Sequence, residues 1–173
     1  MSKPFEGEMI KRFLAGLAAG MMVFSGGVTA EEGLTVSLKR LSLETARQIA
    51  DAALADCRDK GIQVAVTVVD RDGIPQVVLR DSIAPRIALE ISQGNAYAAA
   101  MFGVPTSELG SRANTPIGRV PGLVMSAGGV PVQVGGVLLG AVGVSGAPSG
   151  KTDEACARAG IEAVREDLEM DDG

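Results

Sequence analysis

Two arginines and two hydrogen-bonding side chains stand close together in one polar stretch of the sequence: Arg112, Asn114, Thr115 and Arg119. The surrounding segment, 110–122, is rich in Gly, Pro, Asn and Arg, which is typical of an ordered loop. A guanidinium can hold a carboxylate through two parallel hydrogen bonds, and binding residues often lie on loops between rigid elements. We therefore interpret Arg112, Thr115 and Arg119 as candidate residues for binding an anionic ligand. The alternative is that these are solvated charges paired with nearby acids.

The sequence contains no histidine. It therefore lacks the commonest metal ligand and general base, and every Ser-His or Cys-His nucleophilic pair is excluded. The carboxylates that could do acid–base work are as easily explained as charges on turns or helix surfaces. They are Asp70, Asp72, Asp81 and Glu90. An enzyme of unknown reaction therefore stays only as an alternative.

A glycine-rich stretch, 128–146, is followed by Gly150-Lys151-Thr152, the ending that a phosphate-binding loop needs. The first glycine of that motif is replaced by Ser145, and we expect the preceding strand to pair in an antiparallel hairpin rather than in a βαβ unit. Nucleotide hydrolysis is therefore not favoured. Backbone N–H groups between this strand and the next helix could still bind an anion.

The composition of the chain limits its partners. Its 173 residues are 46% hydrophobic, which predicts one globular domain. With 16 basic residues, 21 acidic residues, a net charge of -5 and no basic cluster, DNA binding is not expected. Four Phe, one Tyr and no Trp offer little for stacking single-stranded nucleic acid.

Residues 1–30 have the organisation of a secretory signal. Two basic residues precede an apolar run at 13–24, and small residues follow up to Ala30. The run is shorter than the roughly 20 residues that a membrane span needs, and its glycines argue against a buried helix. We predict cleavage after Ala30, a mature domain at 31–173, and a periplasmic or secreted protein without a stable membrane span.

Cys57 and Cys156 are the only cysteines, and each falls in a predicted helix. In an oxidising compartment they could form one disulfide. They could also be two small buried hydrophobic residues, which is the interpretation that we prefer. A structural zinc site is excluded, because two cysteines without histidine supply too few ligands.

Apolar periodicity and turn residues predict an α/β domain. We expect a helix capped by Ser42, a hairpin of strands 62–69 and 74–79, a helix that Pro85 opens, and a last helix that Thr152 caps.

A second hairpin is expected from strands 130–134 and 137–144, which a two-glycine turn joins. Counting back from that turn places Val132 opposite Leu139. The second strand is apolar on both faces, so it should be central and covered on both sides. Gly140 and Gly143 within it would let a backbone, a helix or a flat ligand approach.

Several short motifs follow one another along the chain: Leu41-Ser42-Leu43, Ala96–Phe102, Gly128–Pro131, Gly140–Gly146 and Asp153–Gly160. In their order and spacing they resemble the GlcG/HbpS haem-binding family. The resemblance implies a profilin-like α/β fold, with a five-stranded antiparallel sheet flanked by helices, and a homo-oligomer built from dimers. It also implies a ligand, because some members are exported and bind haem, whereas others belong to glycolate-utilisation operons.

The sequence departs from this family where a haem ligand would be expected. Many members carry His where Arg86 stands and Lys where Asn95 stands. Because this sequence contains no histidine, histidine cannot ligate iron in this chain. The other side chains usual at haem iron are tyrosinate, thioether and thiolate. The candidates are Tyr97, Met101, Met125 and the two cysteines. The alternatives are a Tyr97 hydroxyl bonded to backbone at a helix–sheet contact, and methionines that fill gaps in the core.

We therefore predict an exported haem- or tetrapyrrole-binding protein, in haem sensing, storage or transfer. Its ligand-binding residues would be Arg112, Thr115, Arg119, Tyr97 and Met125. A binding module for a small carboxylate such as glycolate is the first alternative, and an enzyme of unknown reaction is the second.

Overall fold

The computed structural model describes residues 34–171. The predicted signal segment, 1–30, and its cleavage point lie outside the described residues. The chain divides into Met1–Val36 and a compact unit, Ser37–Gly173. All the helices and strands described below belong to this second unit.

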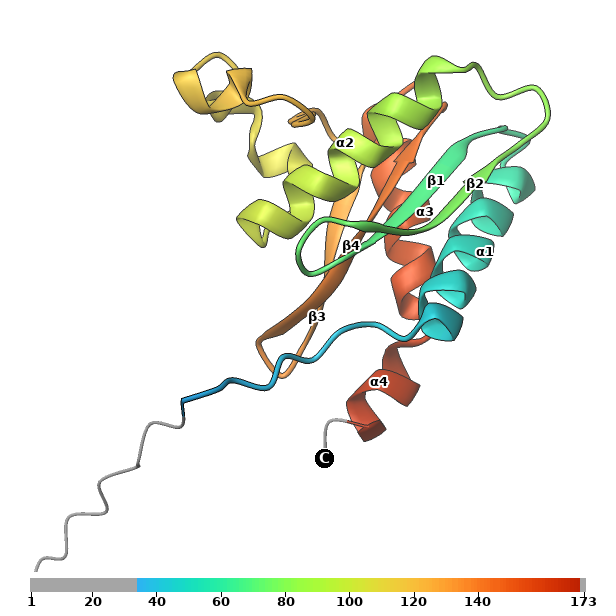
Figure 1. The fold of residues 1–173 in the computed structure, drawn as a ribbon. Helices are drawn as coiled ribbons and strands as arrows, with labels where there is room; N and C mark the ends of the chain where they lie inside the picture. The colour runs from blue at the N-terminus through green and yellow to red at the C-terminus, as the bar shows by residue number, and fades with distance from the viewer. Residues whose placement is uncertain (1–33, 172–173) are drawn as a thin grey trace, which may run out of the picture. The chain divides into compact units, whose positions relative to one another are not determined.

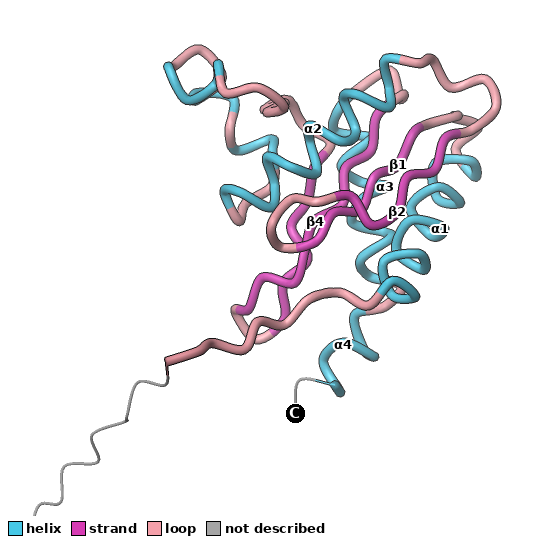
Figure 2. The backbone as a smooth tube through the Cα atoms, viewed as in Figure 1, coloured by secondary structure: helices cyan, strands magenta, loops and turns pink. Residues whose placement is uncertain are grey.

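The described residues form helices, strands and three short 3₁₀ turns (Figure 1, Figure 2). In chain order these elements are α1 (Leu43–Asp59), β1 (Ala65–Asp70), β2 (Pro75–Arg80), α2 (Ile87–Phe102), η1 (Thr106–Glu108), η2 (Gly110–Arg112), η3 (Pro116–Arg119), β3 (Gly129–Val134), β4 (Val137–Ser145), α3 (Gly150–Glu162) and α4 (Arg165–Asp171).

The strands make one antiparallel sheet in the order β2-β1-β4-β3. Strand β4 is central and buried along most of its length, as its apolar residues predicted. Within 34–171 the sheet has four strands, not the five expected. The outer edge of β3 is poorly suited to a further strand, because the Gly129 N–H donates to the Thr106 hydroxyl at 2.8 Å and Pro131 has no N–H.

Helices cover both faces of the sheet. Figure 1 and Figure 2 show α1 and α3 against one face and α2 against the other. The main core lies between the sheet and the α1–α3 pair, where Ile49, Val66 and Val144 are fully buried. A smaller cluster, in which Val69 and Ala141 meet three alanines of α2, fills the other side.

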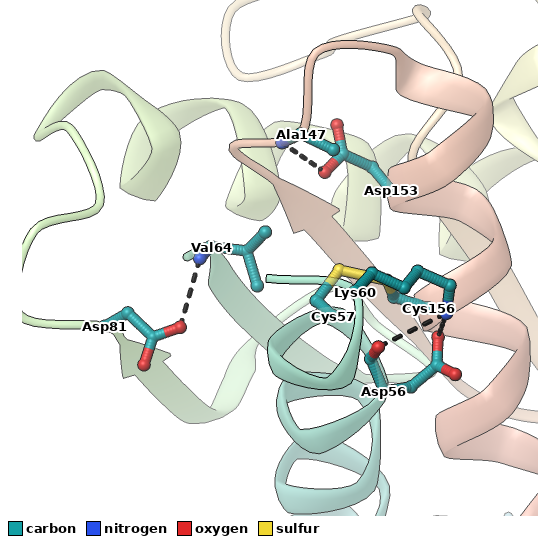
Figure 3. Close-up of a disulfide and its surroundings, with 8 residues drawn as sticks. All are labelled: Asp56, Cys57, Lys60, Val64, Asp81, Ala147, Asp153 and Cys156. Carbon is teal, nitrogen blue, oxygen red and sulfur yellow. Dashed lines mark hydrogen bonds and ion pairs between the residues drawn. A yellow bond between two sulfur atoms is a disulfide. The ribbon is translucent and has the colours of Figure 1, made fainter. Parts of the chain in front are cut away.

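A disulfide joins α1 to α3 through Cys57 and Cys156, and neither residue has exposed surface (Figure 3). The preferred interpretation of two separate hydrophobic residues is therefore wrong. The two helices pack side by side and bring the cysteine Cα atoms to 5.6 Å, a separation that a disulfide can bridge.

The β3–β4 hairpin contains a bulge. The strands pair as expected next to the turn, but the register then shifts, so Val132 lies opposite Gly140 rather than Leu139. Leu139 is the extra residue of the bulge, and its carbonyl accepts a hydrogen bond from the Leu41 N–H at 3.4 Å. The predicted register was wrong beyond this point because it assumed an unbroken ladder.

The helices begin at capping residues, with one difference from expectation. The Ser42 hydroxyl accepts from the Thr45 N–H at 3.1 Å and caps α1, as predicted. Helix α3 is capped by Ser149, whose hydroxyl accepts from the Lys151 N–H at 3.2 Å, and not by Thr152. Ser149 has the extended backbone that a cap requires, whereas Thr152 already lies within the first turn.

Gly143 is where α2 comes very close to the sheet. A β-carbon at this position would lie 2.1 Å from the Ser92 carbonyl oxygen and 2.5 Å from the Ala96 nitrogen. The space that this glycine leaves is therefore filled by the backbone of α2 and is not a place for a flat ligand.

Candidate functional site

The segment 103–128, which we call the lobe, joins α2 to β3 and carries the predicted arginines (Figure 1). It is an ordered loop, built from the three 3₁₀ turns and an apolar cluster of its own. In that cluster Leu109 and Met125 pack with Ala98 of α2. The lobe thus rests on the helix through buried apolar contacts.

The part of the lobe that leads into β3 also forms hydrogen bonds with α2. The Val124 N–H donates to the Gly94 carbonyl at 3.3 Å. The buried amide of Asn95, oriented so that both its ends are satisfied, donates to the carbonyls of Val124 at 3.1 Å and Ser126 at 2.9 Å. A β-carbon at Gly94 would lie 2.4 Å from Val124 Cγ2, so this close approach requires a glycine.

Arg112 and Arg119 are both exposed on the lobe. The guanidinium of Arg112 lies 5.4 Å from the centre of the Phe102 ring, a cation–π contact that leaves its charge facing solvent. Within the described part of the chain neither arginine forms an ion pair. No carboxylate among residues 34–171 therefore neutralises these two charges.

Two other predicted site residues have structural partners. The Thr115 hydroxyl donates to the Arg112 carbonyl at 2.7 Å, so it supports the lobe backbone and keeps only its acceptor capacity for a ligand. Met125 is 6% exposed and lies inside the lobe cluster, where it fills a gap in the core. The structure therefore does not bring Met125 to a ligand-accessible surface.

Tyr97 lies on α2 between the β1–β2 turn and the lobe. A β-carbon at Gly73 would lie 2.4 Å from Cδ2 of its ring, and one at Gly122 would lie 3.7 Å from Cδ1. The ring thus fits between two glycines, both with the positive φ that favours glycine. Its hydroxyl makes no hydrogen bond with the residues that the structure describes, so the expected bond to backbone is not found.

The turn between β4 and α3 holds a carboxylate of its own. Asp153 is buried in the first turn of α3 and accepts from the Ala147 N–H at 2.9 Å (Figure 3). Burial raises the pKa of Asp153 to about 6, against the opposing hydrogen bonds from the Ala147 and Gly146 backbone. Because the Asp153 carboxylate occupies the Ala147 N–H, this N–H is not available to an external anion, and an anion site at the other N–H groups of the turn stays a prediction.

A pocket of about 380 Å³ lies between β3, the first residues of the lobe and the face of α3 that leads into α4. Val130, Pro131 and Ile161 supply apolar lining, and Arg158 and Arg165 supply positive charge. Its volume falls within the range of small-molecule sites.

Each pocket arginine has a glutamate partner. Arg158 Nη2 lies 2.7 Å from Glu154 Oε1, and Arg165 Nε lies 2.6 Å from Glu162 Oε2. The hydrogen bond that Arg165 donates to the Glu162 carboxylate raises the pKa of Arg165 and keeps it cationic. The sequence did not indicate this pocket, because β3 and the start of the lobe, which line it opposite the arginines, are distant from α3 in the chain. The one available signal was the spacing of Arg158, Ile161 and Arg165, which is that of neighbours on one helical face.

Two further classes of site receive no support from residues 34–171. These residues contain no cluster of three or more His, Cys, Asp or Glu side chains that could hold a metal ion. None of their helices is both long enough and apolar enough to cross a membrane.

The family model of the HbpS-like haem degrading proteins matches residues 41–162. The chain belongs to the HbpS-like family. This result confirms the resemblance found in the sequence motifs. No curated protein matches the chain in sequence.

Several solved structures share the fold. The crystal structure of HbpS is 37% identical over 79% of this chain and 99% of its own, with a TM-score of 0.73. A double mutant of Streptomyces reticuli HbpS is equally similar, with 95% of its own chain covered. The PduOC:haem complex is 25% identical over 72% of this chain and 94% of its own, with a TM-score of 0.66. A Klebsiella pneumoniae protein, ORFY, is 24% identical with a TM-score of 0.71, which supports the fold alone.

Proposed function

We propose that this protein binds haem. The observation that carries the proposal is its membership of the HbpS-like family over residues 41–162. The crystallised haem complex of PduOC, a domain of similar fold, adds support. Haem sensing, storage, transfer and degradation all require haem binding. We propose sensing, storage or transfer as the role of this protein.

The charges on the lobe fit a haem with two carboxylate side chains. Arg112 and Arg119 are exposed and have no carboxylate partner among the described residues. We therefore propose that they bind the propionates through paired N–H donors. Thr115 stays a support of the lobe backbone, because its hydroxyl proton is donated to the Arg112 carbonyl and is not available to a carboxylate. Haem, when bound, would supply the iron chemistry, and this chain would supply charge, orientation and shielding.

A thermal shift assay with haemin and with glycolate tests this proposal against its alternative. A ligand that binds only the folded state stabilises it by mass action, by about 2.7 kcal/mol at 100 times its dissociation constant. We expect haemin to raise the melting temperature in a concentration-dependent way. No shift with haemin, together with a saturable shift with glycolate, would favour a carboxylate-binding module instead.

We also propose that the protein is exported. The buried Cys57–Cys156 disulfide supports an oxidising compartment, since such bonds are rare in the cytosol. The proposal predicts mature protein that begins at Glu31, directly after the small residues that suit a signal peptidase. Mass spectrometry of protein from its native source tests this, and a soluble cytoplasmic product with residues 1–30 intact would contradict it.

Assembly into dimers or larger even oligomers is a further part of the proposal. Large apolar side chains between the β1–β2 turn and the start of α2 stay exposed, which favours a protein partner. They are Ile74, Val78, Ile83 and Ile87, each 48–79% exposed. Light scattering of the mature protein should exceed the roughly 14–15 kDa expected of one chain from its length. A stable monomer at micromolar concentration would contradict this.

The pocket beside β3 favours a second candidate function, the binding of a small carboxylate. Arg158 and Arg165 stand at a cavity with apolar lining from Val130, Pro131 and Ile161 and further polar lining from Gln133 and Glu162. Two cations beside apolar residues would suit a short organic acid. Each arginine engages its glutamate through some of its five N–H donors, which leaves others for a ligand. Saturable glycolate binding that Arg158→Gln and Arg165→Gln weaken, and that Arg112→Gln does not, would support this function.

A further inference from the structure

This inference rests on the proposed haem binding and concerns the side chain that holds the iron. The side chains usual at haem iron are imidazole, thiolate, thioether and phenolate. The chain has no histidine. Both cysteines are joined in a fully buried disulfide, so neither supplies a thiolate in the oxidised protein. Thioether and phenolate remain.

Among the described methionines, Met101 alone combines exposure with a place beside a packed surface. Met125 is 6% exposed inside the lobe cluster. Met170 lies on α4, none of whose residues is buried, so it has little around it that could shield a porphyrin. Met101 is 43% exposed on α2. The donors available to a haem within 34–171 are therefore Met101 and Tyr97.

These two donors lie one helical turn apart on α2 and contact the same glycine. A β-carbon at Gly73 would lie 2.4 Å from Cδ2 of the Tyr97 ring and 3.3 Å from Cε of Met101. Gly122 of the lobe stands at the other edge of the ring, where a β-carbon would lie 3.7 Å from Cδ1. The ring is thus held between two stretches of bare backbone, on the side of α2 that adjoins the lobe.

The hydroxyl of Tyr97 is free to act as a ligand. It makes no hydrogen bond with any described residue, and it is not among the buried polar atoms that lack a partner, so it can be reached from solvent. Because the two glycines already hold the ring, binding through the oxygen requires little further ordering of this side chain.

We propose that Tyr97 ligates the iron of the bound haem and that Met101 packs beside it. The phenol oxygen binds as the phenolate, and its proton passes to water. Haem binding therefore releases a proton and strengthens as the pH rises. The lobe, which contributes Gly122 beside the Tyr97 ring, also carries the two arginines proposed to bind the propionates.

The test compares haemin binding by the whole mature protein and three variants: Tyr97→Phe, Met101→Leu and the matched control Met170→Leu. Tyr97→Phe removes only an oxygen without a partner among the described residues, so its melting temperature should equal that of the parent. The readouts are the haemin affinity at several pH values and the phenolate–iron vibration in resonance Raman spectra. The chain has one tyrosine, so a phenolate signal reports on Tyr97 alone.

We expect Tyr97→Phe to abolish the phenolate signal and the pH dependence, and to weaken haemin binding by roughly tenfold or more. Loss of a residue that only supports a metal ligand typically costs about 10- to 100-fold in metal affinity. Loss of the ligand itself should therefore weaken haemin binding at least as much. Met101→Leu should keep the signal, and Met170→Leu should match the parent. A Tyr97→Phe variant with unchanged spectrum and affinity would overturn the assignment of Tyr97 as the ligand, while haem binding itself would stand. The assignment would also be overturned if Met101→Leu lost the parent spectrum and Tyr97→Phe kept it. A parent protein that binds no haemin would overturn the proposed function itself.

Discussion

Breaking the Cys57–Cys156 disulfide should destabilise the domain strongly. The bond joins α1 near one end of the described chain to α3 near the other, with a sequence separation of 99 residues. A crosslink that closes a loop of this length restricts the unfolded chain, and chain-entropy arguments give about 4.7 kcal/mol for 100 residues. Both cysteines are fully buried, so the reduced thiols would still fill the same core positions.

The magnitude converts into a measurable shift. A change of 1 kcal/mol moves the melting temperature by about 2–4 °C for a domain near this size. Loss of roughly 4–5 kcal/mol should therefore lower it by about 10–20 °C.

Equilibrium urea unfolding with and without reductant measures the effect directly. We expect a lower midpoint in reductant and no response in the Cys57→Ala/Cys156→Ala double variant, which controls for other actions of the reductant. Equal midpoints for the parent under both conditions, with two free thiols detected in the unfolded protein, would refute the reasoning.

Three further predictions concern substitutions on the sheet, in the first turn of α3 and on the lobe. Gly143→Ala should destabilise the domain by about 1–3 kcal/mol in urea unfolding, because its β-carbon meets the backbone of α2, whereas Gly110→Ala, which meets nothing within 4 Å, should be nearly neutral. Asp153 has a pKa raised by burial to about 6, above the 3.8 of the unfolded chain. The folded state therefore binds this proton more tightly, and stability should fall as the pH rises from about 4 to 6. Asp153→Asn should flatten that part of a plot of melting temperature against pH. An unchanged plot would show that Asp153 is not the group responsible. Arg112→Ala and Arg119→Ala should each weaken haemin binding by roughly 10- to 100-fold with little change in melting temperature, and variants that bind like the parent would place the anion site elsewhere.

Local sequence signals predicted the elements of this fold well. Ser42 was recognisable as a cap because its partner is only three residues away. The central position of β4 followed from apolar residues on both of its faces. The bulge at Leu139 was not predictable from the hairpin alone, since its carbonyl is bound by Leu41, far away in the sequence. The expectation of a fifth strand came from the family resemblance, and no local pattern marked it.

The candidate site was predictable only in part. A polar loop with two arginines was visible in the sequence, and the lobe places both at the surface. The burial of Met125 depends on how the lobe packs on α2, which no local pattern specifies. The Gly73 contact with Tyr97 and the pocket beside β3 join segments that are distant in the chain. Such contacts follow from tertiary packing, so sequence spacing does not indicate them.

Haemin titration of the purified, oxidised mature protein, followed by the Soret band, tests the central claim most directly. The account predicts a saturable spectral change with a fixed number of haems per chain, and a bound spectrum different from that of free haemin. A linear response that matches free haemin at every concentration would contradict haem binding by this protein.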